Sequence, residues 1–154
     1  MLKEIIFPEK IIAPTLSGER IISESQLWSD SCFNNWGLNE RGKQTPETEL
    51  LVFRLSGSGK LREIFESFGK NLNQLKLSQD QIISFSQKYL HDLLRREEDA
   101  SAFFLFENKG KFFFVGICID EANDNLEAYA YKFSDCHVWQ EKCNHYIVIL
   151  KPLI

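Results

Sequence analysis

The sequence has no long hydrophobic segment. Its longest apolar run, residues 112–119, has eight residues and includes Gly116, whereas a helix that crosses a bilayer needs about 20. The first eight residues also lack the apolar stretch that marks a secretory signal peptide. These absences predict a protein that has no contact with membranes and stays in the cytoplasm. In that compartment its four cysteines are expected to be reduced thiols.

Clusters of basic residues are missing as well. Lys and Arg number 18 against 22 Asp and Glu, which gives a formal net charge of -4. Binding to nucleic acid depends on clustered Lys and Arg that displace counterions from the phosphates. The charge balance therefore predicts no nucleic-acid partner.

Apolar residues, in contrast, are plentiful, at 44% of the chain with thirteen phenylalanines among them. A chain of 154 residues can bury roughly 68–70% of its unfolded surface. That is enough for a core without a disulfide or a structural metal. We therefore expect a single globular domain over residues 1–154.

The middle of the sequence predicts two helices. The first follows Gly59 and is expected to end at Gly69, because glycine readily takes the left-handed conformation found after helix C-termini. The second is expected to begin at Ser78, whose side chain can form a capping box with Gln81. Both carry apolar residues at helical spacing: Leu61, Ile64, Phe65 and Phe68 in the first, and Ile82, Phe85, Tyr89 and Leu93 in the second.

The first and last parts of the sequence predict strands. Short apolar pieces separated by Pro8 and Pro14 indicate short N-terminal strands, and residues 50–55 indicate another. After Asp99 the apolar period changes to 2, and the turn at residues 108–110 favours a hairpin. The expected class is α+β, with short N-terminal strands, two helices and a C-terminal four-stranded antiparallel meander. The meander is expected at residues 103–107, 111–119, 126–133 and 145–150.

Several aromatic positions resemble those of an uncharacterised bacterial protein family of similar length. They are Asp30-x-x-Phe33-x-x-Trp36, Gln81-Ile82 with Phe85, Phe103-Phe104-Leu105-Phe106, Tyr129-x-Tyr131-x-Phe133 and Trp139. The resemblance implies that the chain is one domain. It implies no catalytic residue, substrate or cofactor.

A glycine-containing loop between the predicted strand 50–55 and the first helix is a candidate anion site. Backbone N–H groups at a helix N-terminus attract phosphates, and a lysine adds charge. A P-loop would need glycine where Arg54 stands and a hydroxyl where Leu61 stands. We therefore predict no Mg²⁺-dependent ATP binding and keep open a simpler anion site or a purely structural turn. The candidate residues are Ser56, Gly57, Ser58, Gly59 and Lys60.

Residues of the kind that bind metals or act as nucleophiles gather near the C-terminus. They are Cys136, His137, Cys143 and His145. Zinc prefers four tetrahedral N/S ligands, commonly from two closely spaced pairs, and this spacing matches no standard zinc motif. We predict four free cysteines, no zinc and no cofactor. A small enzyme or metal site built from these residues is an alternative.

One aromatic segment is a candidate recognition surface. Aromatic faces beside amide and carboxylate groups offer both stacking and directional hydrogen bonds to a ligand or partner. The other interpretation is that these aromatics anchor an irregular segment onto the core. The residues are Trp28, Asp30, Phe33, Asn34, Asn35 and Trp36.

These observations favour a non-enzymatic binding or regulatory protein that acts through a protein partner. The sequence contains no complete catalytic or cofactor motif, its charge is mildly acidic, and it is small. The alternatives are a small-molecule or anion binder that uses residues 56–60, and an enzyme or metal site at Cys136, His137, Cys143 and His145. The identity of the partner and the oligomeric state stay open.

Overall fold

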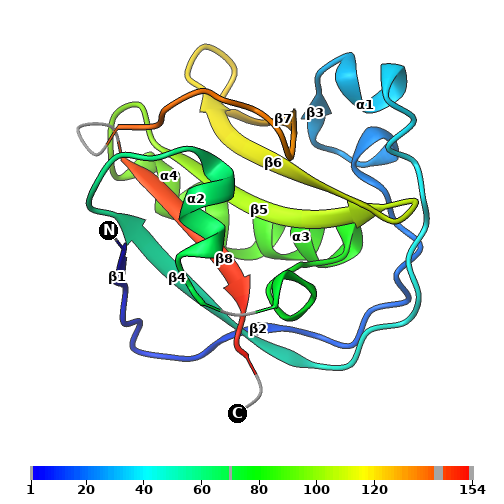
Figure 1. The fold of residues 1–154 in the computed structure, drawn as a ribbon, viewed down its shortest axis with the longest axis horizontal. Coiled ribbons are helices and arrows are strands. Elements are labelled where there is room, and N and C mark those ends of the chain that lie inside the picture. The colour runs from blue at the N-terminus through cyan, green and yellow to red at the C-terminus, as the bar shows by residue number, and fades with distance from the viewer. Residues whose placement is uncertain (1, 70, 141–143, 153–154) are drawn as a thin grey trace.

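The computed structural model describes residues 2–69, 71–140 and 144–152 (Figure 1). Within these residues eight strands form one mixed sheet in the order β1-β4-β8-β5-β6-β7-β3, and β2 also pairs with β4. The strands are β1 (Leu2–Glu4), β2 (Ile11–Ala13), β3 (Trp28–Ser29), β4 (Thr48–Leu55), β5 (Ser101–Asn108), β6 (Lys111–Asp120), β7 (Asn125–Lys132) and β8 (His145–Leu150).

Helices cover both faces of this sheet. Figure 1 shows α2 in front of the sheet and α3 and α4 behind it. The segments α3, η3 and α4 follow one another without a break, so they form one helix over residues 79–95 with a π-helical middle. The helical elements are η1 (Ile22–Glu24), α1 (Cys32–Asn35), α2 (Leu61–Glu66), η2 (Leu72–Gln74), α3 (Gln79–Phe85), η3 (Ser86–Leu90) and α4 (His91–Arg95).

Both predicted helices are present, and their ends have the expected residues. The Ser78 N–H donates to Gln81 Oε1 at 2.9 Å, and the Gln81 N–H donates to Ser78 Oγ at 3.1 Å, which forms the capping box. Gly69, after α2, has a φ of +65°. The short helix α1 is an addition to the two predicted ones. No helix in the described part of the chain is both long and apolar enough to cross a bilayer.

The predicted hairpin is confirmed as β5 and β6. Lys109 and Gly110 connect them, and both have positive φ, at 52° and 79°. Two-residue hairpin turns of this kind match the twist of the strands on either side. β6 also pairs with β7 along its length, so it lies between two antiparallel neighbours as expected.

The predicted four-stranded meander is wrong in its last strand. β8 lies between β4, to which it is antiparallel, and β5, to which it is parallel. Its residues from His145 to Ile149 are all buried, so the strand needs cover on both faces and a neighbour on each side. The parallel pairing of β3 with β7 is a second difference from the predicted antiparallel arrangement. The sheet is therefore mixed.

The core is divided by the sheet into two clusters. On one face the long helix packs against the strands, with Phe85 at 5.7 Å from Phe104 between ring centroids. On the other face α2 packs against the strands, with Phe65 at 5.3 Å from Phe114. The candidate site borders this second cluster.

Candidate functional site

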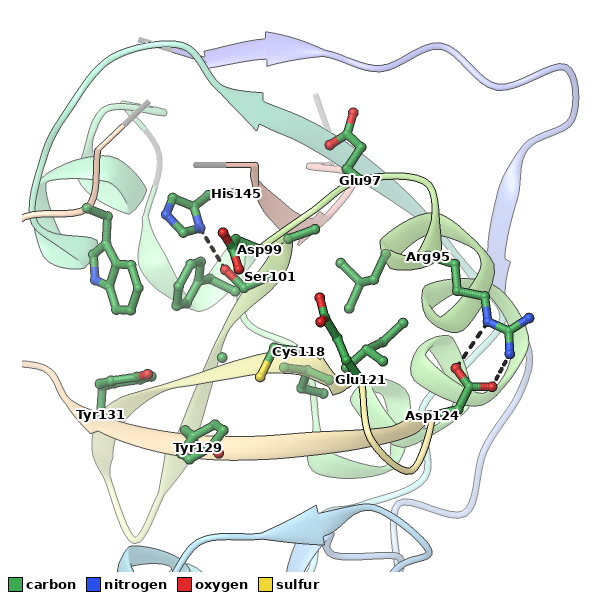
Figure 2. A pocket seen from close by; sticks show the side chains of 17 residues that line it. Arg95, Glu97, Asp99, Ser101, Cys118, Glu121, Asp124, Tyr129, Tyr131 and His145 are labelled. Atoms are coloured by element: carbon green, nitrogen blue, oxygen red, sulfur yellow. Dashed lines mark hydrogen bonds and ion pairs between the residues drawn. The ribbon is translucent and has the colours of Figure 1, made fainter. Parts of the chain in front are cut away.

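A cleft of about 640 Å³ lies at the end of the sheet where β5 begins and β6 ends (Figure 2). Its lining comes from the end of α4 through the start of β5, from the end of β6 through Tyr131 on β7, from Trp139, and from His145 at the start of β8. Four separate stretches of the chain therefore meet there.

The register of the strands places aromatic rings on the floor of the cleft. Phe103, Gly116 and Tyr129 lie directly opposite one another on β5, β6 and β7, so they share one face of the sheet. A Cβ atom on Gly116 would lie 2.7 Å from the ring of Phe103 and 3.1 Å from that of Tyr131. Both rings thus lie over Gly116, in the space that the side chain of a larger residue would occupy.

Trp139 forms an aromatic wall beside this floor. Its ring centroid is 4.6 Å from Phe103 and 5.7 Å from Tyr131. The backbone at Trp139 pairs with Gly59 through two hydrogen bonds of 3.0 and 2.8 Å. These bonds tie Trp139 to the loop that precedes α2.

A serine and a histidine are hydrogen-bonded inside the cleft. Ser101 and His145 lie opposite each other on β5 and β8, and Ser101 Oγ is 2.6 Å from His145 Nδ1 (Figure 2). Burial lowers the pKa of His145, and the nearby His137 lowers it further. The imidazole is therefore neutral at pH 7. In this state it accepts from or donates to the serine according to its tautomer.

In the described part of the chain, the contacts of this pair do not include the other parts of a hydrolytic site. Among the described residues no carboxylate hydrogen-bonds to His145 to orient it, and the N–H of Ser101 donates to the carbonyl of Asn144 at 2.9 Å. Nucleophilic catalysis by serine needs an oriented base and donors for the developing oxyanion. The described contacts supply the base alone.

Two charged clamps fix the loops around the cleft. Arg54 donates to Glu97 Oε1 at 2.7 Å, and the hydroxyl of Tyr146 donates to Glu97 Oε2 at 2.8 Å. Arg95 forms two hydrogen bonds with the carboxylate of Asp124 (Figure 2). The first clamp secures the loop before β5, and the second secures the turn after β6.

The side chains of the cleft lie in a negative environment. Burial raises the pKa of the Cys118 thiol, and the carboxylate of Glu127 raises it further. Burial also raises the pKa of Tyr131 to about 12. Burial and then Glu127 raise the pKa of Tyr129. All three groups are therefore neutral at pH 7.

Three large apolar side chains are exposed in the described ranges, and one of them, Trp28, contacts the floor of the cleft. Trp28 on β3 is 50% exposed, and its ring centroid is 5.6 Å from that of Tyr129 in the floor. Val138, next to Trp139 in the chain, is 47% exposed. Ile6 is the third exposed large hydrophobic residue in the described ranges, and it follows β1 at the opposite edge of the sheet from β3.

No family model, curated protein or solved structure matches this chain. The resemblance to an uncharacterised bacterial family therefore stays untested. The function has to be inferred from the chemistry of the cleft.

The predicted aromatic segment is divided between two environments. Trp28 reaches the rim of the cleft, whereas Phe33 is buried in the core. Trp36 is half-buried and stacks on Phe113 at 6.3 Å. Asp30 accepts a hydrogen bond from the N–H of Cys32 at the start of α1, and Asn34 and Asn35 lie exposed on that helix.

The loop of Ser56, Gly57, Ser58, Gly59 and Lys60 is tied to the cleft wall. Its Gly59 N–H donates to the carbonyl of Trp139. The N–H of Lys60 donates to Glu63 Oε1 at 3.0 Å, so a carboxylate of the chain already occupies the start of α2. Two of the loop's backbone N–H groups, those of Gly59 and Lys60, thus donate to groups of the chain itself.

The predicted metal-type residues are only partly described. Cys143 lies outside the described residues, and Cys136 is exposed. The rings of His137 and His145 both contact Trp139, at 4.5 and 5.2 Å. In the described part of the chain no three possible metal ligands come together. The prediction about zinc stays a prediction.

Sequence reasoning missed most of the cleft. Of its chemically distinctive residues, His145 was a candidate, while Ser101, Cys118 and Trp139 were not. The available signal was Gly116, a glycine inside an otherwise apolar strand, which often marks the close approach of another group. The alternation of Tyr129 and Tyr131 places both tyrosines on the same face of β7.

Proposed function

We propose that the protein is a non-enzymatic binding protein that acts through a protein partner docked over this cleft. The supporting observation is the continuity between the half-exposed Trp28 and the aromatic floor at Tyr129. Aromatic side chains next to a hollow dominate the binding energy of many protein interfaces. A protein partner could cover both Trp28 and the cleft at once.

The other two candidate functions have less support. The enzyme or metal-site alternative uses Cys136, His137, Cys143 and His145, of which Cys143 lies outside the described residues and Cys136 is exposed. An anion binder would use residues 56–60, where Gly59 and Lys60 already donate to groups of the chain itself. The cleft therefore carries the proposal.

Site-specific photocrosslinking tests this proposal in the cells from which the gene comes. A benzophenone amino acid replaces Trp28 in one variant and Ile6 in a control, which is also exposed but lies at the other end of the sheet order. We expect a discrete adduct from position 28 alone. The crosslinked protein is then purified and titrated against the wild-type chain and Trp28→Ala, which should bind roughly tenfold more weakly.

Two results would contradict the proposal. One is equal crosslinking from positions 28 and 6, which would indicate collisions without a specific surface. The other is a purified partner that binds Trp28→Ala as tightly as the wild-type chain.

A further inference from the structure

The charges that line the cleft do not balance. The lining residues within the described ranges include four carboxylates and a single guanidinium, that of Arg95. Asp124 is paired with Arg95, and Glu97 is paired with Arg54. The two remaining carboxylates, Asp99 and Glu121, are exposed and have no hydrogen-bond or ion-pair partner among the described residues. Among the described residues, the cleft therefore presents two carboxylates without a countercharge to an occupant.

Aromatic faces border the same space. Phe103, Tyr129 and Tyr131 form its floor and Trp139 its wall. The face of an aromatic ring carries a partial negative charge, which attracts an ammonium or guanidinium group within about 6 Å of the ring centre. Figure 2 shows Asp99 and Glu121 on the side of the cleft away from Tyr131. A cation between them would meet carboxylates on one side and rings on the other.

The polar groups beside the floor carry no positive charge, and Arg95, the cation among the described lining residues, is paired with Asp124. His145 is neutral at pH 7 because burial lowers its pKa. The hydroxyl of Ser101 and the thiol of Cys118 are uncharged at this pH, since burial raises the pKa of the thiol. A positive group therefore meets no positive charge on the described floor.

We propose that the cleft binds an arginine side chain of the partner, whose guanidinium pairs with Asp99 and Glu121 while its flat face packs on the aromatic floor. Arginine suits this arrangement better than lysine, because its planar group stacks on aromatic rings and forms two parallel hydrogen bonds with a carboxylate. The volume of about 640 Å³ lies within the range of ligand pockets. The inference rests on the proposed function for the source of the arginine, since a protein partner would supply it.

A pair of capped tripeptides tests the class of ligand without the partner. One is Gly-Arg-Gly, and the other has citrulline in place of arginine, which keeps the shape and removes the charge. Each is titrated into the ¹⁵N-labelled full chain and followed by NMR. We expect the arginine peptide to shift the indole N–H of Trp139 and the amide of Gly116 in a saturable way. The citrulline peptide should bind roughly tenfold more weakly.

Matched variants separate the two carboxylates from a general effect of charge. The Asp99→Asn/Glu121→Gln variant should weaken arginine binding roughly tenfold. The control Glu4→Gln/Glu9→Gln removes the same charge near β1, at the far edge of the sheet, and should bind as the wild type does. Thermal melts check that both variants are folded.

Three results would overturn the arginine inference. They are equal binding of both peptides, no shift at the cleft with either peptide, and unchanged binding by Asp99→Asn/Glu121→Gln. The crosslinking from position 28 is independent of these titrations. If crosslinking persists while the titrations fail, the partner surface stands and only its ligand class is wrong; if crosslinking fails while the titrations succeed, the cleft binds a cation that comes from another source.

Discussion

The α2 side of the sheet has two ends that differ in what covers them. At the covered end, Leu105 and Phe114 lie opposite each other on β5 and β6, and Phe65 of α2 packs on Phe114. Tyr131 completes this row on β7 and also lines the cleft. At the open end, two residues farther along each strand, the row is Phe103, Gly116 and Tyr129. The same three strands thus pass from a dry core into a cleft.

The next row completes the change. Ser101, Cys118 and Glu127 lie opposite one another, so small and polar side chains replace the large apolar ones of the covered end. The backbone pairing continues unchanged, and the difference lies only in the side chains. The sheet therefore acts as a rigid support, and the residue types at a few positions along its strands form the site.

Phe65→Ala is expected to have the largest effect on stability, because it removes the ring with which α2 covers the sheet. Phe65 is fully buried, and a truncation of this kind costs about 3–5 kcal/mol of the free energy of unfolding. Urea denaturation measures the loss. In the folded fraction, the arginine peptide should still shift Gly116.

Phe68→Ala is a suitable control for this prediction. Phe68 follows α2, is only half-buried, and packs on Phe53 at 4.9 Å. Its truncation should cost clearly less than that of Phe65. If both variants lost the same stability, burial of Phe65 beneath α2 would not explain the stability of the covered end.

Gly116→Val should fill the floor of the cleft at the open end with a larger side chain. The new side chain would meet the rings of Phe103 and Tyr131, and such overpacking typically costs about 1–3 kcal/mol. Displaced rings would also abolish binding of the arginine peptide. Denaturation and NMR titration read the two effects separately. A variant with unchanged stability and binding would show that the glycine does not shape the floor.

The sequence predicted those features of the fold that depend on a few neighbouring residues. The Ser78–Gln81 capping box, the left-handed Gly69 and the Lys109–Gly110 turn each follow from local backbone chemistry. The position of β8 does not. Its apolar residues show that it is buried, but its choice of β4 and β5 as neighbours depends on packing between distant parts of the chain.

The cleft was harder to predict for the same reason. Ser101, Cys118 and His145 become neighbours only once the register of β5, β6 and β8 is known. The aromatic segment shows a second limit. Trp28 and Phe33 are five positions apart, yet one is exposed and the other is buried. Composition indicates aromatic anchors without showing which of them face outward.

His145→Gln tests the open end through the pH dependence of stability. In the folded chain the pKa of His145 lies below its unfolded value of about 6.5, so the unfolded state binds the proton more readily. Stability therefore falls as the pH drops from about 6.5 toward the folded pKa and stays reduced below it. Urea denaturation at about pH 7.5 and 5.5 measures this fall.

The variant isolates the contribution of this one group. Carboxylates elsewhere also affect stability in acid, but they are common to both proteins. The wild-type chain should lose more stability than His145→Gln between the two pH values. An equal loss would contradict a buried neutral histidine at the open end.

Trp28→Ala is expected to have the smallest effect on stability, because half of its surface already faces solvent. Removing its contact with Tyr129 should cost less than about 1 kcal/mol. Trp36→Ala should cost more, about 1–2 kcal/mol, since Trp36 is half-buried against Phe113 and beneath Lys132. Thermal and urea denaturation compare the two variants directly.

Acrylamide quenching then asks whether the small cost at Trp28 reflects real exposure. Two single-tryptophan proteins are needed, each with Phe at the other two tryptophan positions, so that the emission comes from Trp28 or from Trp36 alone. Trp28 should be quenched more strongly than Trp36, because half of its surface faces solvent. If Trp28 is shielded in the free protein and its removal destabilises the fold as much as that of Trp36, the rim of the open end is part of the core, and a partner would have no exposed tryptophan to bind.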